Sequence, residues 1–200
     1  MRKIWECVFD AFFGHPRGLP GRIGGAIMAR GNADQERWAD ERLASPAGAH
    51  LLLVGHGPGI GLALAADRVG RTGHVVGVDP SATMRQLANA HCAEAIAAGV
   101  VEIRDGSAEH TGCADRSMDA MISVNNVMLW DRRAGLAEAH RVLRPGGRLA
   151  IAVHRHVLNT SPEQLADDVR AAGFVDVTLH VSPRRMNSPA VELLACRPTS

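Results

Sequence analysis

The sequence predicts an α/β fold in which helices cover both faces of a mostly parallel sheet. Two observations predict it. From His50 onward, short apolar runs alternate with longer segments of helical composition. The first of these runs, residues 51–54, enters a glycine-rich turn, and the alanine-rich helical segment 62–69 follows that turn. The chain therefore begins its core with strand, tight loop and helix in that order.

The glycine-rich turn, Gly55-His56-Gly57-Pro58-Gly59, predicts binding of a nucleoside-containing cofactor. Glycines can adopt positive φ and let a ligand approach the backbone closely. The unpaired N–H groups at the start of the following helix suit an anionic group. Asp79 ends the next apolar run, about 20 residues on, where an acidic residue commonly holds a ribose.

The remaining elements are expected in regular order along the chain. Capping residues Ser81 and Ser161 begin helices over 81–98 and 161–173, and a further helix covers 132–143. Later strands are expected over 75–78, 100–103, 120–124 and 148–153, the last preceded by a turn at 144–147. Residues 175–181 and 191–196 predict a terminal hairpin.

The segment before the first strand divides from the core, so we assign residues 1–46 to a helical lid segment and 47–200 to the core of a single domain. Residues 4–13 and 23–43 have helical patterns, and Ile27, Trp38 and Leu43 would supply the buried face of the second. Three roles stay open. The segment could pack on the sheet edge, or it could cover the cofactor and substrate. It could also lie on a membrane surface, but its polar face is not especially basic, which disfavours that role.

Composition excludes several function classes. The 200 residues carry a net charge of +1, which does not favour nucleic acid as a partner. No apolar run approaches membrane-spanning length and the N-terminus is a poor signal peptide, so we expect a cytoplasmic protein that is not an integral membrane protein. The four scattered cysteines show no metal-binding spacing and indicate reduced thiols, so no metal is expected. The absence of tyrosine removes that side chain as a catalytic base.

One crevice is expected to gather the polar residues at the strand ends. In open α/β sheets, ligands bind at the carboxyl ends of the strands beside the first strand. That rule brings together residues 55–59, Asp79, 106–108 and 125–126. His154 and His156 are expected further along the same rim.

These residues, taken together, resemble the class I S-adenosylmethionine-dependent methyltransferases, in particular the small-molecule branch of methyltransferase type 11. The resemblance covers about residues 51–196 and depends on ordered motifs: VGHGPG at 54–59, VDPS at 78–81, DGSAE at 105–109, SMD at 117–119 and LRPGGRL at 143–149. It implies a Rossmann-like, doubly wound sheet of seven strands in three α/β/α layers, mostly parallel with the last strand antiparallel.

The resemblance also implies a cofactor, S-adenosylmethionine, and residues that bind it. The loop glycines Gly55, Gly57 and Gly59, with His56 as a spacer, would wrap its amino-acid end and ribose. Asp79 would accept bonds from the ribose hydroxyls. The adenine would lie near Pro80, Met84, Gly106, Ser107 and Ala108, and the methionine moiety and methyl group near Asn125 and Asn126.

Two departures from the family pattern stand out. Leu53 occupies a position where the family usually has Asp or Glu, and that carboxylate helps to position the cofactor's amino-acid end. Ser107 stands where an Asp often bonds the adenine amino group. These departures motivate the alternative of a non-catalytic binding or regulatory module with the same fold. A dinucleotide-dependent oxidoreductase is a second, less favoured alternative.

The expected reaction is methyl transfer to an oxygen, nitrogen or carbon of a small molecule, such as a specialised metabolite or lipid-like acceptor. His154 and His156 are the candidate catalytic residues if the acceptor must lose a proton, although positioning alone can suffice. Residues 127–130, Val-Met-Leu-Trp, predict either an apolar pocket wall or core packing. The Arg184-Arg185 pair indicates a solvated turn. The acceptor's identity and a homodimer are left open.

Overall fold

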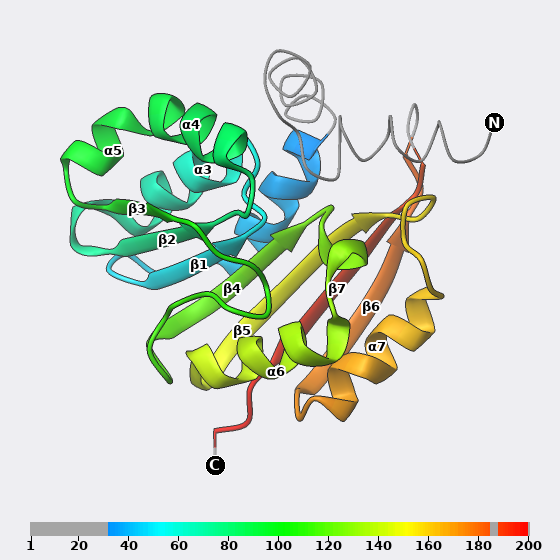
Figure 1. Ribbon diagram of the computed structural model, residues 1–200. Coiled ribbons are helices and arrows are strands. Elements are labelled where there is room, and N and C mark those ends of the chain that lie inside the picture. Colours follow the sequence, from blue (N-terminus) through cyan, green and yellow to red (C-terminus); the bar gives the residue numbers. More distant parts are fainter. Residues whose placement is uncertain (1–31, 185–187, 200) are drawn as a thin grey trace.

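Seven strands form one sheet in the computed structural model, which describes residues 32–184 and 188–199 (Figure 1). The strand order is β3-β2-β1-β4-β5-β7-β6. Strands β1 to β5 pair in parallel, and β7 runs antiparallel to both β5 and β6. The Rossmann-like seven-stranded sheet and its terminal hairpin are therefore confirmed. The strand bounds are β1 His50–Val54, β2 His74–Val78, β3 Val101–Arg104, β4 Met118–Val124, β5 Leu143–His154, β6 Val175–Ser182 and β7 Ala190–Cys196.

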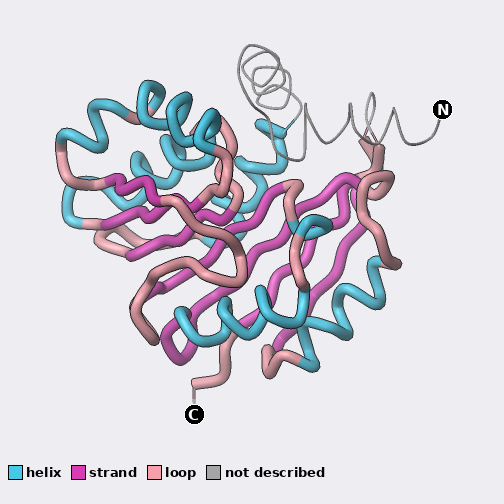
Figure 2. The backbone as a smooth tube through the Cα atoms, in the orientation of Figure 1, coloured by secondary structure: helices cyan, strands magenta, loops and turns pink. Residues whose placement is uncertain are grey.

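Helices lie on both faces of this sheet, on either side of the magenta strands in Figure 2. Alternate residues of β1 show how the two cores form. Leu52 and Val54 pack with residues of α6 and α7, whereas Leu51 and Leu53 pack with α3, α4 and the helix over 32–43. The bounds are α3 Ile60–Val69, η2 Gly70–Thr72, α4 Ala82–His91, α5 Ala93–Ala97, η3 Val127–Leu129, α6 Arg132–Val142 and α7 Pro162–Ala171.

The two predicted helix caps are confirmed. The Ser81 hydroxyl accepts the N–H of Met84 at 3.4 Å, and the Ser161 hydroxyl accepts the N–H of Gln164 at 3.0 Å. Each bond satisfies a backbone donor that has no partner within its own helix. Polar residues with the right geometry therefore mark where α4 and α7 begin.

Two predicted element bounds are wrong. The expected helix over 81–98 breaks at Cys92 into α4 and α5, where the Cys92 thiol contacts the Gly59 carbonyl at 3.5 Å. The expected turn at 144–147 lies within β5 as a bulge, because the register between β4 and β5 shifts there. Gly146 has φ of 78° and donates its N–H to the Arg197 carbonyl at 3.0 Å, so the chain end pairs with the bulge.

The helix over 32–43 is part of the core. Ala39 and Leu43 are buried in the same cluster as Leu51 and Leu53, and Trp38 packs against it. Arg148 of β5 donates to the carbonyl oxygens of Leu43 and Arg42 at 2.6 and 2.9 Å. The rest of the predicted N-terminal segment, including residues 4–13 and Ile27, lies outside the described residues.

Two expected absences can be examined in the described part of the chain. No helix there combines the length and apolarity needed to cross a membrane. Residues 32–184 and 188–199 also hold no group of three potential metal ligands. Their three cysteines, Cys92, Cys113 and Cys196, are free thiols.

Candidate active site

A cleft of about 340 Å³ opens at the carboxyl ends of β1, β2 and β4. These neighbouring strands run in parallel, so the residues that follow each of them meet at one edge of the sheet. All the predicted cofactor residues line the cleft except Gly59 and Gly106. Those that line it are Gly55, His56, Gly57, Asp79, Pro80, Met84, Ser107, Ala108, Asn125 and Asn126.

Asp79 lies directly after β2 and is only 6% exposed. Its two carboxylate oxygens accept the backbone N–H of Gly57 at 3.0 Å and that of Ser81 at 2.8 Å. Burial raises the pKa of the carboxyl group above its usual value. A carboxylate has about four acceptor positions, so two backbone donors leave room for further hydroxyl donors from a ligand.

His56 is buried beside this carboxylate. Its Nδ1 lies 2.8 Å from the Gly57 carbonyl oxygen, which can only accept, so Nδ1 carries the proton. Burial lowers the pKa of the imidazole, and the neutral ring is favoured. Its Nε2 has no hydrogen-bond partner among the described residues. His56 therefore lines the cleft with one buried acceptor, Nε2, that no described residue engages.

The loop glycines divide between ligand contact and packing. Gly57 has φ of 55°, and a Cβ built on it would meet nothing within 4 Å, so a ligand can approach its backbone. Gly59 has φ of 99° at the start of α3, and a Cβ built on it would lie only 3.0 Å from the Ala88 backbone. A Cβ built on Gly106 would lie only 2.9 Å from the His110 carbonyl oxygen. Gly59 and Gly106 shape the loops that line the cleft, but they do not line it themselves.

Asn126 joins the elements around the cleft. Its amide nitrogen donates to the carbonyl oxygens of Val54 and Val124 at 2.7 and 3.1 Å. Its amide oxygen accepts from the Ser123 hydroxyl at 2.9 Å and from the Trp130 indole at 2.8 Å. This side chain therefore holds the ends of β1 and β4 and the wall residue Trp130 in one arrangement.

The apolar run over 127–130 has both predicted roles. Val127 is fully buried in the core, whereas Leu129 is 56% exposed and lines the cleft together with Trp130. The 3-10 turn η3 causes this division because it places consecutive side chains on different sides. The cleft consequently has a polar side at Asp79 and an apolar side at Leu129 and Trp130.

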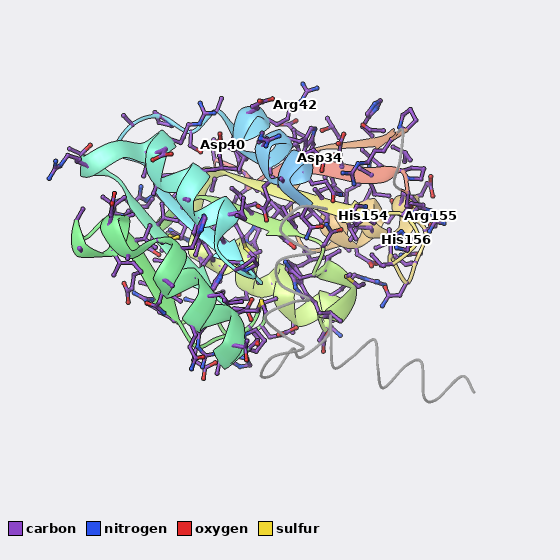
Figure 3. The ribbon with its side chains drawn as sticks, turned by 90° about the horizontal axis from the view of Figure 1, so that it is seen from above. Asp34, Asp40, Arg42, His154, Arg155 and His156 are labelled. Atoms are coloured by element: carbon purple, nitrogen blue, oxygen red, sulfur yellow. The ribbon has the colours of Figure 1, made fainter. Side chains whose placement is uncertain are left out.

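The two candidate catalytic histidines do not line the cleft. They lie together at the end of β5, with ring centroids 5.6 Å apart (Figure 3). The His154 Nδ1 lies 3.0 Å from Arg184, whose guanidinium can only donate. Burial, followed by the charges of Arg184 and His156, lowers the pKa of His154. The Nδ1 lone pair is thus already occupied by a hydrogen bond.

Arg184 is not in a solvated turn, so that prediction is wrong for this residue. Its side chain is 12% exposed and forms an ion pair with Asp34 of the helix over 32–43. Figure 3 shows Asp34 at the end of that helix, with Asp40 and Arg42 further along it. Tertiary packing supplies the partner that the sequence does not reveal. Arg185 lies outside the described residues.

Sequence reasoning missed two cleft residues on the helix over 32–43, Asn32 and Glu36. The Asn32 amide oxygen accepts from Asn125 at 2.8 Å, and the neighbouring Gln35 accepts from the same amide at 2.7 Å. Asn125 has φ of 53°, and these bonds help to hold that conformation. The only signal in the sequence was a helical pattern before the first strand.

The comparison with known proteins decides the family. The methyltransferase domain family matches residues 52–151. The uncharacterized methyltransferase YdaC of Bacillus subtilis is 33% identical over 165 residues, which cover 78% of this chain and 88% of that protein. The chain is a class I S-adenosylmethionine-dependent methyltransferase. Family membership favours the enzyme over a non-catalytic module.

A further relative and a solved structure are also methyltransferases. The arsenite methyltransferase of Halobacterium salinarum is 39% identical over 124 residues, which are 62% of this chain and 30% of that protein. A SAM-dependent methyltransferase from Aquifex aeolicus has the same fold, with a TM-score of 0.69 and 19% identity over 80% of this chain and 88% of that one. The chain thus spans most of YdaC but less than a third of the arsenite enzyme.

The cleft fits the family's cofactor, S-adenosylmethionine. A buried carboxylate with unused acceptor positions, Asp79, lies beside an open glycine backbone at Gly57. The neighbouring Met84 and Ala108 offer apolar surface of the kind that a purine ring requires. When bound, the cofactor supplies an electrophilic methyl group on a sulfonium.

Proposed function

We propose that the enzyme methylates a small, largely apolar acceptor that binds against Leu129 and Trp130. The observation that carries this proposal is the exposure of Leu129, which faces the cleft instead of the core. Large apolar side chains exposed in a concave site favour an apolar ligand. The acceptor lies in the same cleft as the cofactor, which the reaction requires.

In this proposal the polar side of the cleft holds the nucleoside. Asp79 accepts the ribose hydroxyls, and the Gly55 and Gly57 backbone adjoins the ribose and amino-acid end. Pro80, Met84, Ser107 and Ala108 enclose the adenine. Asn125 and Asn126 lie beside the reacting end, where their bonds to the helix and to the strand ends fix the shape of the cleft.

The protein's main contribution is orientation. Methyl transfer from a sulfonium is an in-line displacement, and holding the acceptor in line supplies much of the acceleration. The occupied Nδ1 of His154 supports a positioning role for that histidine, through Arg184 and Asp34, over a role as proton acceptor. His156 is exposed and adjoins it.

The acceptor class is proposed from the cleft more than from relatives. The arsenite methyltransferase is named for a small inorganic acceptor. Arsenite binds thiols, but no cysteine of the described residues lines the cleft. The apolar side of the cleft, at Leu129 and Trp130, supports an organic acceptor with an apolar body.

Two measurements test the proposal. Isothermal titration with S-adenosylmethionine and with S-adenosylhomocysteine should show binding of both. Turnover is then measured as S-adenosylhomocysteine release with phenols, amines and carboxylic acids of graded apolar size. Leu129→Ser should raise KM for the best acceptor while cofactor affinity stays the same, because Leu129 contacts only the acceptor. No cofactor binding at millimolar concentration would contradict the proposal.

A further inference from the structure

Glu36 is a partly buried acid whose carboxyl group has no counter-charge among the described residues. It projects from the helix over 32–43 and lines the cleft. Among the described residues, no hydrogen bond or opposite charge acts on its carboxyl group, and burial alone raises its pKa to about 8. A carboxylate in such surroundings is costly unless a cation pairs with it.

The position of the carboxyl group is well defined. A Cβ built on Gly61 would lie 2.9 Å from the Glu36 carboxyl carbon and 3.0 Å from a methyl group of Leu53. The carboxyl group therefore adjoins both the first turn of α3 and the side chain of Leu53. Gly61 leaves the room that the Glu36 side chain occupies.

This location complements the chemistry of the cofactor. S-adenosylmethionine carries an ammonium group at its methionine end, and an ammonium group in a closed site needs an acceptor that is preferably charged. Leu53 is apolar and provides none. Asp79, at the end of β2, is engaged by Gly57 and Ser81 and is assigned to the ribose.

We propose that Glu36 binds the ammonium group at the methionine end of the cofactor, so that the helix before the sheet supplies the carboxylate that Leu53 lacks. This inference depends on the assignment of the cleft to S-adenosylmethionine. Two contacts hold the helix that carries Glu36. Gln35 accepts a hydrogen bond from the Asn125 amide at 2.7 Å, and Arg148 donates to the last carbonyl oxygens of the helix. Glu36 is therefore placed by a fixed element of the core.

The uncharged surroundings of Glu36 couple cofactor binding to the release of a proton. Gly61 of α3 and Leu53 of β1, which lie next to the Glu36 carboxyl group, carry no charge. The other titratable groups that line the cleft are His56, Asp79 and Glu109. Glu36 is mostly protonated at pH 7 in the free protein, and it ionises when an ammonium group binds beside it, so binding releases a proton.

Affinity measurements on the full-length protein test this inference. Glu36→Gln should weaken S-adenosylhomocysteine binding roughly 10- to 100-fold, as loss of a charge-assisted bond does. Binding of 5′-methylthioadenosine, which lacks the amino-acid end, should not change. Glu41→Gln, on the exposed face of the same helix, is the matched control and should bind both ligands like the wild type.

Proton release provides a second readout. Titrations at pH 7 in buffers of different ionisation enthalpy should show up to about one more proton released by the wild type than by Glu36→Gln. Equal affinity for S-adenosylhomocysteine in the two proteins, with equal proton release, would overturn the role of Glu36 but leave the cofactor assignment in place. Absence of binding in the wild type would overturn the cofactor assignment with it.

Discussion

At the scale of single residues, the site contains two carboxylic acids that differ in their hydrogen-bond partners. Asp79 accepts two backbone N–H groups, whereas Glu36 has no partner among the described residues. Both carboxyl groups have raised pKa values because both are buried. Asp79 thus organises the glycine loop, and Glu36 is free to respond to a ligand.

Replacement of Asp79 should weaken cofactor binding. In Asp79→Asn, charge-assisted bonds become neutral and the amide nitrogen faces a backbone donor, so we expect a loss of roughly 10- to 100-fold in affinity. Isothermal titration with S-adenosylhomocysteine measures it. Asp105→Asn, 75% exposed after β3, is the control and should change affinity by less than about twofold. Equal affinities would mean that Asp79 does not hold the ribose.

Glu36 should also make the free protein less stable as pH rises. Its pKa in the folded state, about 8, exceeds the 4.5 of a glutamate in water, so the folded state binds the additional proton between these values. Stability therefore falls as pH rises from about 4.5 towards 8. At pH 8, Glu36→Gln should be more stable than the wild type by roughly 1–3 kcal/mol, the lower end applying if water enters the cleft.

Denaturant titrations of both proteins at pH 5 and pH 8 measure this difference. The advantage of Glu36→Gln should be small at pH 5 and larger at pH 8. A constant difference across this range would show that the Glu36 carboxyl group titrates normally.

At the scale of elements, short polar side chains hold strands and helices in the geometry that the cleft requires. Asn126 links the ends of β1 and β4 to Trp130, and Asn125 links β4 to the helix over 32–43. Asn125 also accepts the His154 N–H at 2.8 Å, which fixes the end of β5. The two asparagines thus connect β1, β4, β5 and the helix over 32–43, and they also line the cleft.

Asn126→Asp should destabilise the fold. The new carboxylate would face the carbonyl oxygens of Val54 and Val124, where the amide nitrogen now donates two bonds. Loss of buried bonds and repulsion should cost roughly 2–4 kcal/mol. Urea denaturation measures the loss. Asn89→Asp on the exposed face of α4 serves as the control, with a change within about 0.5 kcal/mol.

At the scale of the whole molecule, the helix over 32–43 packs into one of the two cores beside the sheet. Its buried residues Ala39 and Leu43 share a core with β1 and α3. The ion pair of Arg68 with Asp40 adds a connection at its outer face. We therefore propose that residues 32–43 fold together with the core over 47–200, as parts of the single domain that the sequence predicts.

Deletion of residues 1–44 tests this proposal. It would remove Leu43 and Ala39 from the core and leave Leu51 and Leu53 less covered, so we expect a loss of several kcal/mol or failure to fold. Circular dichroism and thermal unfolding measure the outcome. Leu43→Ala is the milder variant and should cost roughly 2–4 kcal/mol. A stable truncated protein with an unchanged melting temperature would support a detachable lid.

Local patterns in the sequence predicted most of the fold because its determinants are local. Ser81 and Ser161 bond to residues three positions on, and the alternation of strands and helices sets the layers. The bulge at residues 144–147 was not predictable, since the pairing of Gly146 with Arg197 joins distant parts of the chain. At the break near Cys92, the thiol likewise contacts a residue far away in the chain, Gly59.

The sequence by itself determined the chemistry at the strand ends: a glycine loop after β1, an acid after β2 and an asparagine pair after β4. Residues that follow adjacent parallel strands must meet at one edge, so spacing along the chain is enough. Only the tertiary structure decided that Gly59 and Gly106 pack instead of lining the cleft, that His154 is engaged by Arg184, and that Glu36 lies beside Leu53. These outcomes depend on how a helix before the sheet packs against it, and long-range packing leaves no periodic signal in the sequence.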